Sequence, residues 1–342
     1  DTSFPEKADL GYAKILRLPP LGNLFHRLFH RTKENNVASS SDSVRHGLSH
    51  EFFGLVNVVF FFLVQVRIFF AIISNKFDFC HTNDWDCLFA GYLYSRFRKT
   101  VWIHDSHELY AEQDPDFPRS FKKIVRYTES IFFRRVNHLI TVNNSIAQYF
   151  SAEYGILSPG IIYNCPVSED IPPPPSHEGP VTFIYVGLYE KNRGLEELIE
   201  CFSSVEGLLY FQGFGTREEW LRNRVQELGL EKKVVFIAPV PGSQIVSSIS
   251  GFDIGLLPYK PVCLNNYYAS PNKLFEYMMA GLAIVSVDIP EVRRIVHEWK
   301  NGVLYDPSDV GDFIEKVRHL AENPDLVASM KKNSLSSAQK EY

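Results

Sequence analysis

One stretch in the C-terminal half of the sequence combines groups that bind phosphate with a group that binds hydroxyls. Ser270 and Pro271 are typical of a helix start. Lys273 follows in the first turn, and Glu276 comes one turn later. The open amides of a helix start favour anions, and a lysine there adds a full positive charge, whereas a carboxylate accepts hydrogen bonds from hydroxyls. The pattern predicts a phosphorylated ligand with hydroxyls, although an ordinary capped surface helix has the same local pattern.

The residues that follow make this pattern specific. The run from Ser270 through Pro290-Glu291-Val292 to residues 301–307 resembles, nearly position by position, the nucleotide-sugar-binding half of family four glycosyltransferases. These are retaining enzymes of the GT-B fold, common in bacterial polysaccharide and lipopolysaccharide synthesis. The resemblance implies sugar transfer from a nucleoside diphosphate donor to an acceptor hydroxyl, on a surface glycan or its lipid carrier.

The resemblance also implies a set of donor-binding positions. Arg193 matches a basic residue that clamps the diphosphate, whereas Leu188 stands where a second basic residue is usual. Gly213 borders the donor site, and the turn at Val240 matches the position that holds the nucleobase through backbone contacts. The implied donor-binding residues are Gly187, Arg193, Gly213, Val240, Tyr268, Ser270, Pro271, Asn272, Lys273 and Glu276.

One position departs from the family pattern. Family members have a second acidic residue eight positions before the helix glutamate, and this chain has Tyr268 there. Glu276 would still hold the ribose hydroxyls. Contact with the transferred sugar is then expected from Asn265, Asn266 or the backbone amides of residues 268–270, and the pattern does not identify the sugar.

In the N-terminal half, polar residues follow two apolar strands. The resemblance identifies His107 as the histidine at the reaction centre, so that the implied catalytic residues are His107 and Glu276. The alternative for His107 is an ordinary loop histidine whose ring forms hydrogen bonds with backbone groups. The expected acceptor-side residues are His81, Asn83, Asp84 and His104.

The same region contains Asp84 and Asp86, spaced like the metal-diphosphate motif of another glycosyltransferase fold. That motif follows a different topology, and we interpret the match as coincidental. Lys273, Arg193 and helix amides would offset the charge of the diphosphate. We therefore expect no metal site and no cofactor.

The composition excludes several classes of protein. The chain has 342 residues, enough for two domains, and its net charge of -5 argues against a nucleic-acid partner. Its five cysteines form neither a CxxC motif nor a zinc-ligand spacing with histidine, which favours reduced thiols in the cytoplasm. We expect a cytoplasmic protein, and a location at the inner face of the cytoplasmic membrane stays open.

Residues 52–73 form one long apolar run. Gln65 and Arg67 near its middle would be costly in hydrocarbon, by about 2.5–3.5 kcal/mol for the arginine. A buried helix is the favoured interpretation, a helix on a membrane surface the second, and a transmembrane span the third. Basic and aromatic residues in 25–31 and basic residues in 119–135 predict peripheral contact with an anionic membrane, although solvated helix faces have the same composition.

Strand and helix patterns alternate along the chain, which is typical of parallel sheets covered by helices. We assign residues 1–165 to an N-terminal acceptor-side Rossmann-like domain, 166–180 to a proline-rich linker, and 181–342 to a C-terminal nucleotide-sugar-binding domain. The fold class is α/β, and the resemblance implies the GT-B fold, with two doubly wound parallel-sheet domains facing a cleft. Compared with the family, we expect the first strand and helix and the end of the C-terminal helix to be missing.

The expected elements can be given by residue range. The expected strands are 13–18, 77–82, 100–105, 138–142, 160–163, 181–186, 208–212, 234–237 and 254–257. The expected helices are 52–73, 87–96, 121–135, 145–154, 195–202, 218–228 and 243–249. Residues 33–50, rich in serine, asparagine and charge, are expected to form a mobile loop.

Two other functions stay open at this stage. A sugar epimerase of the same fold would share the architecture, but should present clustered acids and histidines for elimination chemistry. A catalytically silent binding or scaffold subunit is the non-enzyme alternative, which the departures at Tyr268 and Leu188 make less remote.

Overall fold

The computed structural model describes residues 7–9, 14–16, 43–167 and 179–342. Contact density divides the chain into two units. One contains the residues up to Ser106 together with Asp116–Leu139, and the other contains His107–Pro115 together with Ile140–Tyr342. Most of the predicted linker, residues 168–178, and the basic run at 25–31 lie outside the described residues.

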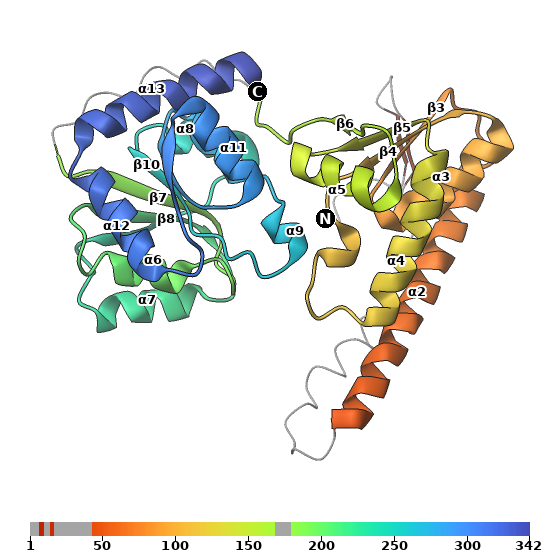
Figure 1. Cartoon of the computed structure of the whole chain (residues 1–342), viewed down its shortest axis with the longest axis horizontal. Helices are drawn as coiled ribbons and strands as arrows, with labels where there is room; N and C mark the ends of the chain where they lie inside the picture. The colour runs from red at the N-terminus through yellow and green to blue at the C-terminus, as the bar shows by residue number, and fades with distance from the viewer. Residues whose placement is uncertain (1–6, 10–13, 17–42, 168–178) are drawn as a thin grey trace. The chain divides into compact units, whose positions relative to one another are not determined.

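The first parallel sheet has four strands in the order β3-β4-β5-β6 (Figure 1). Its strands are β3 (Phe79–Asn83), β4 (Val101–Ser106), β5 (His138–Thr141) and β6 (Gly160–Ile161). The helices of this part are α2 (Ser43–Ile72), α3 (Trp85–Arg98), α4 (Arg119–Phe132) and α5 (Asn144–Tyr154), with the short 3-10 helices η1 (Tyr110–Glu112) and η2 (Phe133–Arg135). Buried aromatic side chains such as Trp102 and Tyr94 fill the space between strands and helices.

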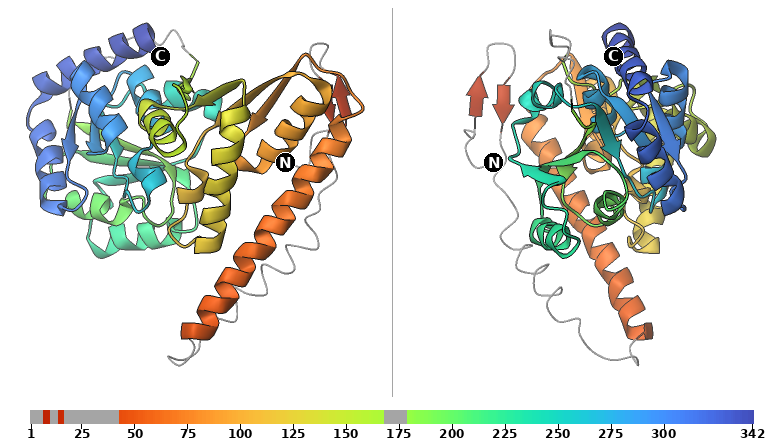
Figure 2. Two further views of the ribbon diagram at one scale, coloured as in Figure 1. Left: turned by 45° about the vertical axis from the view of Figure 1, so that its right-hand side comes forward. Right: turned by 90° about the vertical axis from the view of Figure 1, so that its left-hand side faces the viewer.

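The long helix α2 packs against α3 and α4, as the two views in Figure 2 show. It begins at Ser43, so residues 43–50, which we expected in a loop, are helical. The expectation of a buried helix holds for only part of its surface, because Gln65 and Phe69 are buried whereas Val59, Phe62 and Leu63 are each about half exposed. Among the described residues, no helix is both long and apolar enough to cross a membrane.

A separate pair of short strands corrects the prediction for residues 13–18. β1 (Lys7–Asp9) and β2 (Lys14–Leu16) pair antiparallel with each other, and neither belongs to the parallel sheet. Antiparallel strands need only a short connection, whereas a parallel neighbour needs a crossover of a dozen or more residues. A strand pattern alone does not distinguish the two.

The second parallel sheet has six strands in the order β12-β11-β10-β7-β8-β9. Its strands are β7 (Thr182–Leu188), β8 (Leu208–Phe214), β9 (Val234–Ile237), β10 (Ile254–Leu257), β11 (Ala283–Val287) and β12 (Gly302–Tyr305). Every residue of β10 and β11 is buried, as expected for a parallel sheet covered on both faces. The strand order reverses between β7 and β10, which is the point where open α/β sheets bind ligands.

Helices cover both faces of this sheet (Figure 1). They are α6 (Leu195–Cys201), α7 (Glu218–Glu227), α8 (Ile245–Ile249) with the 3-10 helix η3 (Gly242–Gln244) before it, α9 (Leu264–Tyr267), α10 (Asn272–Met279), α11 (Pro290–Trp299), α12 (Val310–Ala321) and α13 (Pro324–Glu341). Pro271 is the N-cap of α10, so Ser270 lies one residue too early to cap it. Gly281 follows the helix with φ of 71°, a left-handed conformation that ends the helix as predicted.

Tyr277 of α10 joins the two strands at the reversal point. β7 and β10 pair at Phe183 and Ile184, and beyond this the Tyr277 hydroxyl accepts a hydrogen bond from Val186 N (2.9 Å) and donates one to Leu256 O (3.3 Å). The phenol thus replaces ladder hydrogen bonds that the separating strands no longer make. A Cβ at Gly255 would lie 2.4 Å from the Tyr277 ring, so glycine provides the space for the ring.

We expect Tyr277→Phe to lower the free energy of unfolding by roughly 1–3 kcal/mol, because it leaves a buried amide and a buried carbonyl without their partner. Urea denaturation of the variant and the parent measures the difference. Tyr210→Phe is the matched control, since its hydroxyl makes no hydrogen bond within the part of the chain that the structure describes. Equal stability of the Tyr277 and Tyr210 variants would contradict the bridging role.

Candidate functional site

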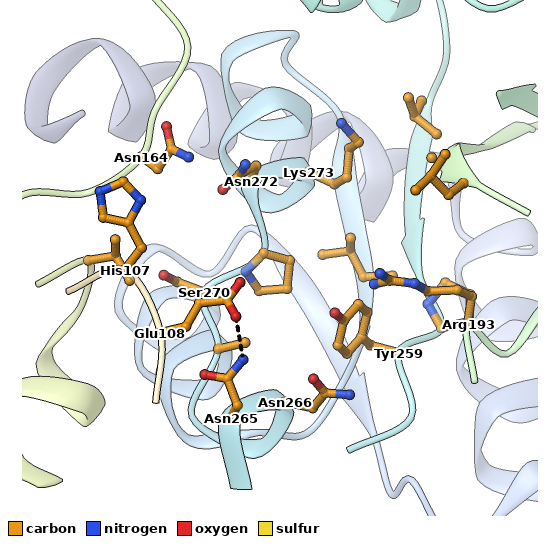
Figure 3. A pocket seen from close by; sticks show the side chains of 18 of the residues that line it. His107, Glu108, Asn164, Arg193, Tyr259, Asn265, Asn266, Ser270, Asn272 and Lys273 are labelled. Atoms are coloured by element: carbon orange, nitrogen blue, oxygen red, sulfur yellow. Dashed lines mark hydrogen bonds between the residues drawn. The ribbon is translucent and has the colours of Figure 1, made fainter. Parts of the chain in front are cut away.

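A pocket of about 480 Å³ lies at the carboxyl ends of β7 and β10 (Figure 3). Every residue that lines it belongs to the second unit. Its polar lining consists of His107, Glu108, Asn164, Tyr185, Arg193, Tyr259, Asn265, Asn266, Ser270, Asn272 and Lys273. The volume is in the range of small-molecule sites, and the place is the one that the strand order predicts.

The start of α10 forms one wall of the pocket. Ser270, Pro271, Asn272 and Lys273, four of the expected donor-binding residues, line it. Glu276 does not line the pocket. Its carboxylate is paired with Lys273, whose ammonium nitrogen lies 2.9 and 3.1 Å from the two carboxylate oxygens. The lysine is therefore shared between an internal ion pair and the pocket, and an anion in the pocket would compete with Glu276 for it.

Arg193 provides the second permanent positive charge. Its guanidinium carbon lies 4.6 Å from the centre of the Tyr259 ring, a cation–π geometry that orients the side chain. The next residue, Gly194, has φ of 67°, and a Cβ there would lie 2.0 Å from Pro258 O. The arginine loop is thus held tightly against the residues that follow β10.

Gly187 and Gly213 are paired near the carboxyl ends of the parallel strands β7 and β8. Gly187 has φ of 151°, and a Cβ on Gly213 would lie 1.9 Å from Gly187 O. A second hollow of about 180 Å³ adjoins these strand ends, and it is lined by Gly187, Gly213, Val240 and Lys273 among others. The two hollows share Gly187 and Lys273, and all of the predicted donor residues except Tyr268 and Glu276 line one or the other.

Tyr185 lies beside Gly187, where an added Cβ would lie 3.1 Å from the Tyr185 hydroxyl oxygen. Burial raises the pKa of Tyr185, with nearby Arg193 acting in the opposite direction. The phenol is therefore protonated at neutral pH and donates a hydrogen bond to Leu188 O (3.0 Å). This bond fixes the backbone where the pocket begins.

The loop after β4 brings His107 and Glu108 to the pocket. Asn265 holds this loop: its Oδ1 accepts from Leu109 N at 2.8 Å, and its Nδ2 donates to Glu108 Oε2 at 3.3 Å. Asn265 is one of the residues expected to contact the transferred sugar, and it lines the pocket. Its side chain also contacts the chain itself, as the dashed line in Figure 3 shows for Glu108.

Tyr268 does not line the pocket. Its ring packs on Tyr149, with 6.1 Å between the ring centres, and its carbonyl accepts a hydrogen bond from Asn143 Nδ2 (2.9 Å). The same amide donates to Ser270 Oγ (3.1 Å). Asn143, the N-cap of α5, thus positions the segment that leads into α10, a role that the sequence did not indicate.

The expected acceptor-side residues belong to the first unit, at the carboxyl ends of β3 and β4. His81 and Asn83 are exposed, and His81 Nε2 lies 3.8 Å from Asp105 Oδ2. Asp84 has φ of 53°, a conformation that non-glycine residues rarely adopt.

His104 differs from the accessible position expected for an acceptor contact. Its side chain is fully buried, with Nδ1 2.8 Å from Thr82 Oγ1 and its ring against Trp102 and Phe133. It points into the core because alternate residues of β4 face inward.

No group of three or more metal-ligating side chains occurs in residues 7–9, 14–16, 43–167 and 179–342. The polar chemistry of the pocket is instead divided by charge. Arg193 and Lys273 favour phosphate, whereas Glu108 and the amides of Asn164 and Asn272 can bind hydroxyls. Sequence reasoning did not identify Glu108, Asn164 or Tyr259, since each lies on a loop and reaches the pocket only through the fold.

Two protein families match adjacent parts of the chain. Residues 26–165 match Glycosyltransferase Family 4, and residues 167–336 match Glycosyl transferases group 1.

The chain is also similar to individual proteins. It is 28% identical over 163 residues to lipopolysaccharide 1,6-galactosyltransferase of Salmonella typhimurium. The matched segment covers 45% of this chain and 44% of that protein's length. Sucrose-phosphate synthase from Thermosynechococcus elongatus has a similar fold, with a TM-score of 0.66 at 15% identity, covering 99% of this chain and 82% of the other. HepE from Anabaena, solved in complex with UDP, has a TM-score of 0.65 at 14% identity, covering 81% of this chain and 78% of the other.

We expect Lys273→Ala and Arg193→Ala each to weaken binding of a nucleoside diphosphate by about tenfold or more and to leave binding of the nucleoside nearly unchanged, because their expected partner is phosphate. Titration calorimetry measures both ligands. Lys232→Ala, which removes an exposed lysine outside the pocket, is the control for net charge. Equal losses for the nucleoside diphosphate and the nucleoside would mean that the two residues support the structure rather than bind phosphate.

Proposed function

The chain belongs to the glycosyltransferases of group 1 and family 4, which have the GT-B fold, and from this premise we propose that it transfers a sugar from a nucleoside diphosphate donor to an acceptor hydroxyl with retention. The observation that supports the donor most directly is the pocket at the strand reversal. It combines two cations and a helix start with hydroxyl-binding side chains.

The donor's parts are assigned by their chemistry. The diphosphate lies at Arg193 and Lys273, and the nucleobase lies in the adjoining hollow near Val240. When phosphate draws the Lys273 ammonium, the Glu276 carboxylate is released to accept hydrogen bonds from the ribose hydroxyls. This exchange explains how a glutamate that is paired without ligand contributes to donor binding.

The chemical step follows from the family. The acceptor oxygen forms its bond to the sugar's anomeric carbon on the face from which the diphosphate leaves, and the bond to the leaving oxygen breaks. The acceptor's proton passes to the leaving phosphate. Arg193, Lys273 and the amides of α10 stabilise the charge that develops on that phosphate, and His107 orients the sugar.

The acceptor is proposed to be a surface glycan or its lipid carrier. The galactosyltransferase that resembles part of this chain is named for lipopolysaccharide, which supports a glycan of this class. Contact with an anionic membrane on its cytoplasmic face is part of the proposal. The half-exposed apolar residues of α2, beside an apolar hollow of about 360 Å³ between α2, α3 and α4, support it.

The test of this function is a panel of nucleotide sugars. UDP-, GDP- and ADP-linked sugars are incubated separately with the full chain and candidate lipid-linked glycans, and free nucleotide and glycosylated product are both measured. The proposal expects one donor to give nucleotide and product in equal amounts, with the anomeric configuration retained by NMR. Nucleotide release without transfer would favour the epimerase, and neither nucleotide binding nor release would favour a scaffold.

We expect activity to persist in EDTA, because side chains and a helix start offset the diphosphate's charge. Turnover with the donor identified in the panel is compared with and without the chelator. A strict requirement for Mn²⁺ or Mg²⁺ would contradict this and direct attention to Asp84 and Asp86.

We expect His107→Ala to lower kcat much more than it changes donor affinity, since a group that acts on the reacting sugar stabilises mainly the transition state. His138→Ala, an exposed histidine outside the pocket, is the matched control. Wild-type turnover of the His107 variant would make His107 an ordinary loop histidine.

A further inference from the structure

Glu108 holds a special position in the pocket. Among the described residues that line it, Glu108 alone has a carboxylate. In Figure 3 the Glu108 side chain lies beside Ser270, on the side of the pocket away from Arg193. The pocket therefore has a cationic end and an end with a negative charge.

The Glu108 carboxylate is oriented by neighbouring amides. Its Oε2 accepts hydrogen bonds from Asn265 Nδ2 (3.3 Å) and from Gln113 Nε2. Asn265 also binds Leu109 N (2.8 Å), and Leu109 is buried, so the loop backbone next to Glu108 is fixed. A side chain held by its neighbours loses less conformational entropy when it binds a ligand.

This charge distribution orients a nucleoside diphosphate sugar. Phosphate is attracted by Arg193 and Lys273 and repelled by Glu108, so the sugar rather than the diphosphate lies beside the carboxylate. A carboxylate accepts hydrogen bonds from hydroxyls, and the sugar is the part of the donor at this end that has them. Tyr268, at the position where the family pattern has an acidic residue, faces Tyr149 instead.

We propose that Glu108 binds hydroxyl groups of the transferred sugar and thereby determines which donor sugar the protein accepts. This inference rests on the proposed function, since it requires a nucleotide sugar in the pocket. Glu108 takes the part that position 268 cannot provide, from a different loop. A site with a fixed hydrogen-bond acceptor discriminates strongly against sugars that lack the matching hydroxyl.

The first experiment compares a nucleotide with its sugar conjugate. Glu108→Ala and Glu108→Gln are titrated with the donor identified in the nucleotide-sugar panel and with the corresponding nucleoside diphosphate. We expect the Ala variant to bind the nucleotide sugar about 10- to 100-fold more weakly and the free nucleotide as well as the parent does. Glu112→Gln, on the same loop but outside the pocket lining, is the control for loss of a negative charge.

The second experiment uses donors from which single sugar hydroxyls have been removed. If Glu108 binds a given hydroxyl, removing that hydroxyl and removing the carboxylate have non-additive effects on kcat/KM. For at least one deoxy donor, the loss of kcat/KM relative to the complete donor should be much smaller in the Ala variant than in the parent. Equal losses in variant and parent for every deoxy donor would overturn the proposal.

The remaining outcomes separate this inference from the function it rests on. Unchanged nucleotide-sugar affinity in Glu108→Ala, or equal losses for nucleotide and nucleotide sugar, overturns the role of Glu108 alone. Loss of kcat with unchanged donor affinity also overturns it, since it would mean that Glu108 acts on the reaction rather than on recognition. A parent protein that binds no nucleotide of the panel contradicts the proposed function and this inference together.

Discussion

The arrangement of the pocket depends on one side chain, the Tyr277 phenol between the ends of β7 and β10. Parallel strands that separate leave backbone groups without partners, and a buried orphan amide or carbonyl is costly. Tyr277 pairs Val186 N and Leu256 O, and Gly255 leaves room for its ring. Because Tyr277 belongs to α10, the same hydrogen bonds place the start of that helix beside the strand reversal. The start of α10, with Lys273, therefore lies next to the place where β7 and β10 separate.

Charge then divides this opening into two ends. Arg193 is stacked on Tyr259, and Lys273 is held by Glu276, so both cations are oriented before any ligand arrives. The ion pair of Lys273 is not fully buried, because Lys273 and Glu276 keep 27% and 14% of their side-chain surface exposed. A diphosphate with two negative charges can compete for such a lysine, and under the proposal the ribose hydroxyls then replace the lysine as partners of the Glu276 carboxylate, whose Oε2 is buried. The pairing at rest and the proposed exchange on binding are thus compatible.

The sequence predicted what depends on local pattern and on the family resemblance. Apolar runs indicated most strands to within a few residues, and Gly281 indicated the end of α10. It did not predict the antiparallel pairing of β2, because residues 13–18 have the same pattern in either direction. It placed His104 at an accessible edge, although its register in β4 turns the side chain into the core. Glu108 and Asn164 were missed because their positions depend on contacts between distant segments, which one sequence does not reveal.

Two asparagines show why those distant contacts matter. Asn143 binds Tyr268 O and Ser270 Oγ, and Asn265 binds Leu109 N and Glu108, so each joins segments more than 100 residues apart. Each side chain makes hydrogen bonds with loop groups that have no partner in a regular helix or strand. Neither asparagine belongs to a sequence motif that would have predicted these contacts. These hydrogen bonds also hold the Glu108 carboxylate in the pocket of a chain that has tyrosine at position 268, where the family pattern has an acidic residue. The segment around Tyr268 is tied down by Asn143, while Asn265, three residues earlier, fixes the loop that supplies Glu108.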